Sequence, residues 1–172
     1  RTIESAGARR GAMMGTLHIS HPDVLEFIEV KKKPGALTMF NISLLVTDEF
    51  LSAVQSGHNW AFSFGGKTYG TIPARELWQR IVETTFEYSE PGVIFIDRVN
   101  LTNPLRNIEL ISATNPCGEQ PLPPYGACNL GTINLTRFVK QPFTHNATFD
   151  YGRFASVTHT AIRFLDSIVE AS

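Results

Sequence analysis

LTMFNISLLV, residues 37–46, carries the clearest information about the architecture of this chain. Its apolar residues follow one another almost without alternation, which predicts a strand covered on both faces, as in a parallel sheet. On either side of it, the pattern predicts further strands over 13–20, 60–64 and 93–96 and helices over 48–54, 74–89 and 151–170. Strands that alternate with helices indicate an α/β fold with parallel strands.

Local residues predict how several of these elements begin, end and pack. His21-Pro22-Asp23 is expected to start a helix, because Pro suits the first helical position and Asp its positive end. Lys31-Lys32-Lys33 is expected to end that helix as a solvated basic run. GTINL, 131–135, is predicted to form a strand. The helix over 74–89 is expected to bury one apolar face, made of Leu77, Trp78, Ile81, Val82 and Phe86.

Composition places the chain among folded globular proteins. It has 172 residues, of which 42% are hydrophobic and 18% charged, and this suits a single domain. A net charge of −1 predicts no general attraction to nucleic acid or to an anionic membrane, and no apolar run approaches the length of a membrane span. Two cysteines favour a cytoplasmic setting. Because the chain starts with Arg and stops inside a predicted helix, we expect an internal piece of a longer protein.

Residues 97–126 show little periodicity and contain five of the ten prolines, which is typical of a functional loop. Within them, Asn115-Pro116-Cys117-Gly118-Glu119-Gln120 places a thiol, a carboxylate and an amide within five positions. Pro116 fixes its own φ, and Gly118 permits conformations closed to other residues. A sharp turn could therefore direct Asn115, Cys117 and Glu119 into one small volume.

Each of the two cysteines has more than one interpretation. Cys117 could be a small buried residue, the commonest role of a free cysteine. Zinc is not expected because no CxxC or HxxxH pattern is present, and no histidine lies between His58 and His145 to activate a thiolate. Redox or radical chemistry, with a carboxylate as proton acceptor, remains. Cys128 could pack in a strand, pair with Cys117, or pair with a cysteine outside the chain.

The neighbouring polar residues are equally open to two interpretations. Glu119 is either a solvated loop residue or a general base beside the thiol. Asn115 either caps the loop or donates a hydrogen bond to a substrate oxygen. Arg9 and Arg10, beside Gly11, are either solvated or bind a nucleotide through their guanidinium groups.

Two motifs carry a resemblance to a known family. NPCGEQPL (115–122), followed by GACNLG (126–131), resembles the active-site finger loop of the ribonucleotide reductase large subunit. The NPCGEQ form is similar to class II, the adenosylcobalamin-dependent branch. RRGAMM (9–14) and FNIS (40–43) are similar to earlier barrel segments of the same family, so the resemblance covers about residues 5–135.

The resemblance implies a ten-stranded α/β barrel of two antiparallel halves, with a central finger loop that carries the active-site cysteine. Residues 1–172 would be a fragment of this catalytic barrel domain, in which 109–130 form the finger loop and 1–15 the effector and specificity loop. Arg9 and Arg10 would then link effector binding to substrate choice, and Gly118 would line the substrate site. A closed, dry barrel interior would shield Cys117 from water.

The same resemblance implies a chemistry, ribonucleoside-diphosphate reduction to 2′-deoxyribonucleotides for DNA synthesis. Cys117 would carry a transient thiyl radical that removes the 3′ hydrogen of the ribose. Glu119 would accept the 3′-hydroxyl proton, and Asn115 would hydrogen-bond the substrate hydroxyls. Cys128 would be one of two thiols that reduce the 2′ carbon, while the other redox cysteine and a C-terminal cysteine pair are absent from this chain.

Adenosylcobalamin is the implied cofactor. The implied partners are a ribonucleoside diphosphate, deoxynucleotide or ATP effectors, thioredoxin or glutaredoxin, and a second copy of the chain in a homodimer. The alternatives are a class I large subunit with a separate radical-generating subunit, a non-catalytic nucleotide-binding module, and a glycyl-radical enzyme on a similar barrel. The fragment alone is expected to be inactive.

Overall fold

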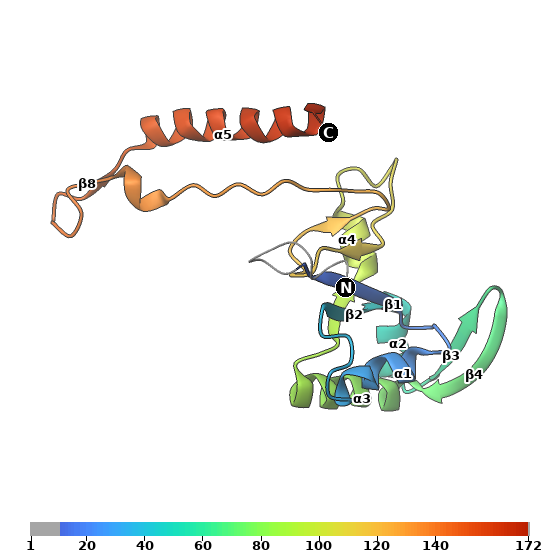
Figure 1. Cartoon of the computed structure of the whole chain (residues 1–172). Coiled ribbons are helices and arrows are strands. Elements are labelled where there is room, and N and C mark those ends of the chain that lie inside the picture. The colour runs from blue at the N-terminus through green and yellow to red at the C-terminus, as the bar shows by residue number, and fades with distance from the viewer. Residues whose placement is uncertain (1–10, 172) are drawn as a thin grey trace. The chain divides into compact units, whose positions relative to one another are not determined.

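The chain divides into two compact units, Arg1–Gly126 and Ala127–Ser172, and each is described by itself (Figure 1). The computed structural model describes residues 11–171. Arg9 and Arg10, and most of the predicted effector loop, lie outside the described residues. Within 11–171, no helix combines the length and the apolar character that a membrane crossing requires.

The first unit contains a three-stranded parallel sheet. β1 (Met13–His18) and β5 (Gly92–Phe95) flank β2 (Phe40–Val46), which is the central strand. The α/β fold with parallel strands, predicted from the apolar run over 37–46, is confirmed. β2 begins three residues later than predicted because residues 34–39 form turns.

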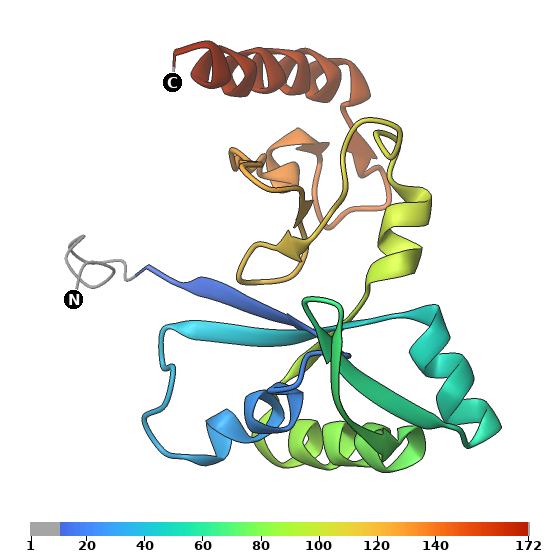
Figure 2. The same cartoon turned by 90° about the vertical axis from the view of Figure 1, so that its right-hand side faces the viewer.

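Three helices and a hairpin accompany the sheet, and α1 and α3 lie along one of its faces (Figure 2). The elements are α1 (Val24–Glu29), α2 (Asp48–Ser56), α3 (Ala74–Tyr88), β3 (Asn59–Phe64) and β4 (Lys67–Pro73). Side chains from all of them pack against β2 in one hydrophobic core, which includes Val24, Ile28, Leu44, Val46, Phe50, Trp60, Ile72, Leu77 and Ile81.

Phe50 of α2 shows how this core is built. Its side chain is fully buried, and its ring meets that of Trp60 edge to face at 5.2 Å between centroids. The indole Nε1 of Trp60 donates a hydrogen bond to Ile19 O at 3.2 Å, so the buried polar group is satisfied. Burying one such large apolar side chain contributes roughly 1.5–3 kcal/mol, and the core therefore fixes the helices against the sheet.

The predicted helices form, with local signals at their ends. Thr47 Oγ1 accepts a hydrogen bond from Phe50 N at 3.2 Å at the start of α2, and Gly57, with φ 72°, ends it. Pro73 precedes α3 as predicted. The buried face of α3 differs from the prediction: Phe86 is 90% exposed, whereas Thr84 is buried. Residues 77, 81 and 84 share a face at helical spacing, and residue 86 lies about 200° around from 84.

Several boundaries and elements differ from the sequence predictions. α1 begins at Val24, and Pro22 and Asp23 form a turn before it. β4 was not predicted, because its exposed residues lack a strand pattern and only the Gly65-Gly66 turn signals the hairpin. α4 (Ile96–Thr102) occupies a stretch predicted to be irregular. Its seven residues are too few to display helical periodicity.

Lys31 is not the freely solvated cation that the sequence predicted. It belongs to η1, a 3-10 helix over Val30–Lys32, and its Nζ lies 2.9 Å from Glu90 Oε2. The same Nζ donates hydrogen bonds to Leu37 O and Phe40 O. Glu90 Oε1 in turn accepts a hydrogen bond from Ile42 N at 2.9 Å. This half-buried ion pair therefore binds the first residues of β2.

The second unit is built around α5 (Tyr151–Ala171), which confirms the predicted last helix. η2 (Leu135–Phe138) and the short pair β8 (Val139–Lys140) and β9 (Thr148–Phe149) precede it, and the rings of Phe138, Phe149 and Phe154 pack together. The predicted strand over 131–135 is wrong. In the described residues no strand pairs with it, and Gly131 instead packs against Leu165 of α5.

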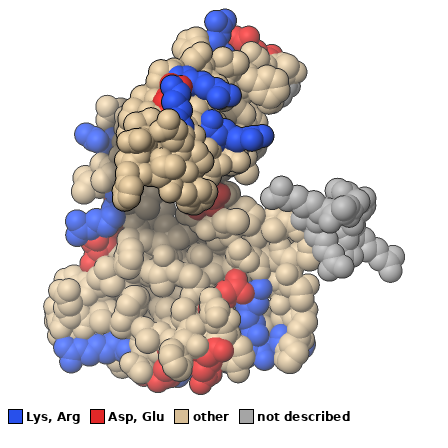
Figure 3. Space-filling view, turned by 90° about the vertical axis from the view of Figure 1, so that its left-hand side faces the viewer, with Lys and Arg blue, Asp and Glu red and all other residues tan. Residues whose placement is uncertain are grey.

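Charges on the surface carry both signs. On the face of the first unit shown in Figure 3, Lys and Arg side chains are interspersed with Asp and Glu. Elsewhere in this unit, Arg80 pairs with Glu76 on α3 at 2.9 Å, and Lys32 of η1 pairs with Glu29 of α1 at 3.5 Å. Such exposed pairs contribute little to stability.

Candidate active site

The hexapeptide forms a tight loop at the end of a short hairpin. β6 (Ala113–Thr114) pairs antiparallel with β7 (Pro121–Leu122), and residues 115–120 connect them. Asn115 N donates to Gln120 O at 3.1 Å, and Gly118 N donates to Asn115 O at 3.0 Å. Gly118 has a φ of 82°, a conformation that favours glycine. The turn is therefore as sharp as its Pro and Gly residues predict.

Asn115 stabilises this loop from within. Its Oδ1 accepts a hydrogen bond from Gln120 N at 3.0 Å, and because a backbone N–H can only donate, this contact identifies the oxygen end of the amide. The loop-capping interpretation is thus supported. The Nδ2 end makes no hydrogen bond to any residue between 11 and 171, so it remains able to donate to another molecule.

Cys117 lies at the tip of the loop and is exposed as a free thiol. The exposure excludes the buried packing role for this cysteine within the part of the chain that the structure describes. It also differs from the expected dry environment, because residues 11–171 leave the sulfur open to solvent. The hairpin holds the tip residues by backbone bonds at its base, and their side chains extend beyond the core.

A groove of about 350 Å³ lies between the loop and the sheet. Its lining includes Asn41, Ser43, Glu90, Gly92, Pro116 and Cys117. The volume falls within the roughly 300–1,000 Å³ of small-molecule sites. Cys117 and Gly118 therefore face a space in which a small molecule could bind.

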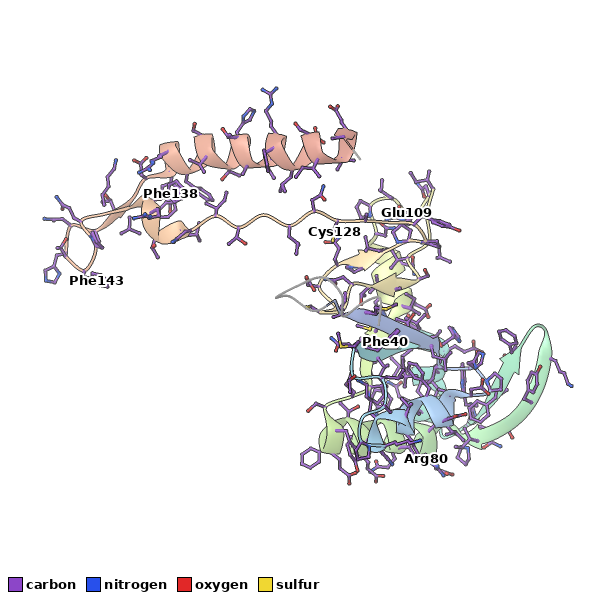
Figure 4. All side chains as sticks on the ribbon, in the orientation of Figure 1. Phe40, Arg80, Glu109, Cys128, Phe138 and Phe143 are labelled. Atoms are coloured by element: carbon purple, nitrogen blue, oxygen red, sulfur yellow. The ribbon has the colours of Figure 1, made fainter. Side chains whose placement is uncertain are left out.

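The other predicted residues are placed differently. Glu119 is exposed and does not line the groove, so the predicted convergence of Asn115, Cys117 and Glu119 on one volume is not seen there. Cys128 is exposed and free in the extended segment of the second unit, where Figure 4 labels it. Its pairing stays a prediction.

Sequence reasoning missed the groove residues of the sheet. In the parallel register, Ser43 of β2 lies opposite Gly92 of β5, and Asn41 lies opposite Met14 of β1. Ser43 is buried, yet its hydroxyl makes no hydrogen bond to the described residues. A signal was present, since a serine inside a largely apolar strand is a buried polar group that requires an explanation.

One hydrogen bond connects the loop to the sheet near Cys117. Asn41 Nδ2 donates to the carbonyl oxygen of Pro116, which precedes the cysteine. Two further contacts hold the base of the hairpin: Thr16 Oγ1 donates to Ser112 O at 3.5 Å, and Asn100 Nδ2 donates to Ile111 O at 3.0 Å. The loop is thus attached to the sheet and to α4.

Comparison with known proteins gives the family. A family model described as the ribonucleotide reductase barrel domain matches residues 1–172. The chain is 40% identical to the vitamin B12-dependent ribonucleoside-diphosphate reductase of Thermoplasma acidophilum, with 99% of this chain and 22% of the relative covered. It is also 40% identical to the protein of that name from Mycobacterium tuberculosis, with 99% and 24% covered.

A more distant match is the vitamin B12-dependent ribonucleotide reductase of Rhodopirellula baltica, which is 32% identical over 92% of this chain and 18% of the relative. The chain thus spans less than a quarter of the length of these relatives. The family match covers the sheet, the groove and the Cys117 loop alike. The chain belongs to the ribonucleotide reductase barrel-domain family.

Proposed function

We propose that this chain is part of the catalytic barrel of an adenosylcobalamin-dependent ribonucleoside-diphosphate reductase, which makes 2′-deoxyribonucleotides for DNA synthesis. Two relatives that carry the vitamin B12-dependent name are 40% identical to it. The structural observation that supports the proposal best is the position of Cys117 on a tight loop that lines a groove. A structural cysteine would not need such a place.

The proposed architecture goes further than the described residues. The three-stranded parallel sheet would be one section of a ten-stranded barrel, and residues 109–130 would be the finger loop at its centre. The remaining barrel would then supply the cover that Cys117 lacks here. Residues 1–15 would form the effector and specificity loop, in which Arg9 and Arg10 contact nucleotide.

In the proposed reaction, a Cys117 thiyl radical takes a hydrogen atom from the 3′ carbon of the ribose. Glu119 accepts the proton of the 3′ hydroxyl, and the Nδ2 of Asn115 donates a hydrogen bond to a substrate hydroxyl. The free Nδ2 and the engaged Oδ1 of Asn115 support a double role, in which one end shapes the loop and the other holds substrate. Glu119 would need to turn toward the groove when substrate binds.

Reduction then requires two thiols. The 2′ hydroxyl leaves as water, and Cys128 together with a second cysteine supplies two electrons and becomes a disulfide. Cys117 finally returns a hydrogen atom to the 3′ carbon, which restores its radical. Because the chain has only two cysteines and Cys117 is the radical site, the second reducing thiol would come from elsewhere in the enzyme.

One residue of this chain, Cys117, would meet the cofactor. Adenosylcobalamin, when bound, supplies the radical that oxidises a nearby thiol. Cys117 is the residue that would meet it, and its exposed sulfur can be reached from outside the described residues. The groove of about 350 Å³ suits a nucleoside rather than a corrin ring, so it is assigned to the substrate.

The proposal includes the partners and location expected of such an enzyme. These are a ribonucleoside diphosphate substrate, deoxynucleotide and ATP effectors, thioredoxin or glutaredoxin as reductant, and a homodimeric, cytoplasmic enzyme. The interspersed surface charges and the net charge of −1 are compatible with small nucleotide ligands rather than long nucleic acid.

Full-length variants with single cysteine replacements test the assigned roles. Cys117→Ser should abolish both deoxynucleotide formation and isotope loss from a 3′-tritiated substrate, because both need the thiyl radical. Cys128→Ser should abolish deoxynucleotide formation but keep some loss of the 3′ label. Turnover by Cys117→Ser would overturn the proposal, because Cys117 would then only pack and this part of the enzyme would only bind nucleotide.

The cofactor is tested separately. The purified full-length chain should reduce a ribonucleoside diphosphate only when adenosylcobalamin is added, with no second protein present. Activity that instead required a separate metal-containing subunit would identify a class I enzyme. Activity with neither would contradict both.

A further inference from the structure

Asn41 connects the sheet to the tip of the Cys117 loop. Its Nδ2 donates to Pro116 O across 75 residues of sequence. Within residues 11–171, no other hydrogen bond joins residues 114–121 to a group outside the hairpin. We propose that Asn41 is a positioning residue that orients Cys117 for hydrogen-atom transfer. The inference rests on the proposed function and assigns a further residue to it.

The Pro116 carbonyl oxygen, which accepts the hydrogen bond from Asn41, belongs to the peptide unit that sets the orientation of Cys117. The peptide unit is planar, so the Pro116 carbonyl lies in one plane with the N and Cα atoms of Cys117. A hydrogen bond that fixes the direction of this oxygen fixes that plane. The ring of Pro116 also locks its own φ. The sulfur of Cys117 is then left with few free torsions.

Asn41 itself is held on both sides. It lies in the central strand, opposite Met14. The carbonyl of Phe40 accepts a hydrogen bond from Lys31, and the N–H of Ile42 donates to Glu90. The ion pair of Lys31 with Glu90 thus fixes the backbone immediately before and after Asn41. A rigid strand, rather than a second mobile loop, sets the position of the cysteine.

The exposure of Asn41 separates positioning from stability. Asn41→Ala removes one hydrogen bond between two neutral groups, and such a bond contributes little net stability. We therefore expect the thermal midpoint of a variant to stay near that of the parent. A displacement of about 1 Å at a reacting atom can lower turnover about 100-fold. For Asn41→Ala we expect kcat to fall about 10- to 100-fold, by more than KM rises, although Asn41 also lines the groove.

The experiment uses the full-length enzyme with adenosylcobalamin. Asn41→Ala removes the donor, and Asn41→Asp keeps the shape but places an acceptor against the Pro116 carbonyl. Asn59→Asp is the control for charge, because Asn59 is exposed at the start of β3 and does not line the groove. kcat and KM are measured together with peptide-resolved hydrogen exchange over residues 113–122.

The inference predicts lower kcat and faster exchange in this peptide for both Asn41 variants, and no change for Asn59→Asp. Parent-like exchange and kcat in a folded Asn41 variant would overturn it, and Asn41→Asp decides if Asn41→Ala does not fold. Faster exchange reports the tie to the loop even where turnover is absent. If Cys117→Ser keeps turnover, the proposed function fails while the exchange result still tests Asn41.

Discussion

Gly92→Ala adds one methyl group to the groove lining, where it meets the side chain of Ser43. The two residues lie opposite each other on β5 and β2. A Cβ at position 92 would lie 2.7 Å from Ser43 Oγ, whereas the next atoms, Ile42 O and Ser43 Cβ, are at 3.7 Å. The clash in Gly92→Ala therefore involves one atom, the serine hydroxyl oxygen.

The expected magnitude follows from this geometry. Overpacking usually costs about 1–3 kcal/mol, and rotation of the serine hydroxyl relieves part of it at about 0.5–1.5 kcal/mol. Alanine in a strand recovers about 0.5–1 kcal/mol relative to glycine. Gly92→Ala should thus lower the free energy of unfolding by about 1 kcal/mol. In a Ser43→Ala background the clash is gone, and the same change should be neutral or stabilising.

The assay is a double-mutant cycle on the full-length protein. Urea unfolding of the parent, both single variants and the double variant gives the coupling free energy, expected to be about 1 kcal/mol in favour of the double variant. Equal destabilisation by Gly92→Ala with and without the Ser43 hydroxyl would refute the reasoning, because the added methyl group would then not clash with Ser43 Oγ. The added methyl group also narrows the groove, so turnover is measured on the same four proteins.

Three further predictions concern stability and titration. Leu77→Ala should lower the free energy of unfolding by about 2–5 kcal/mol, because Leu77 is fully buried. Val82 lies on the same helix but is 45% exposed, so Val82→Ala should lower it much less. Partial burial lowers the pKa of His18 below 6.5, and the nearby Asp97 opposes this shift only in part. The stability that the neutral imidazole contributes is therefore present above pH 6.5 and is lost as the pH falls through the lowered pKa. His18→Gln should remove this part of the pH dependence of urea unfolding. The side-chain hydrogen bond from Lys140, aided by one from Arg153 N, lowers the pKa of Asp150 below 3.8, so Lys140→Met should raise this pKa toward 3.8 in a carboxyl NMR titration.

Local patterns accounted for most of the first unit. The largely apolar run over 37–46 identified the central strand β2, and a Pro followed by helical periodicity identified α3. β4 was missed because its exposed residues carry no strand pattern, and it forms by pairing with β3 across a two-glycine turn. The strand predicted over 131–135 failed for the opposite reason. Strand-forming residues need a partner strand, and within residues 11–171 no strand pairs with 131–135.

The candidate site was predictable only in part. Pro116 and Gly118 act on their own backbone, so the sharp turn could be inferred from six residues. The contact of Asn41 with Pro116 could not, because it joins residues 75 positions apart through the packing of the hairpin on the sheet. The exposure of Cys117 was equally beyond reach, since burial depends on what surrounds a loop rather than on its own residues.

The alternation of side chains along β2 explains how one strand serves both the core and the groove. Successive side chains point to opposite faces, so Leu44 and Val46 enter the hydrophobic core while Asn41 and Ser43 face the loop that carries Cys117. β1 and β5 pair with the two edges of β2, and the helices that pack on one face bury Leu44 and Val46 there. The two polar residues of β2 therefore lie on the face toward the groove and the Cys117 loop. Ser43 is buried there with no hydrogen-bond partner among residues 11–171, and a polar ligand in the groove would give its hydroxyl one.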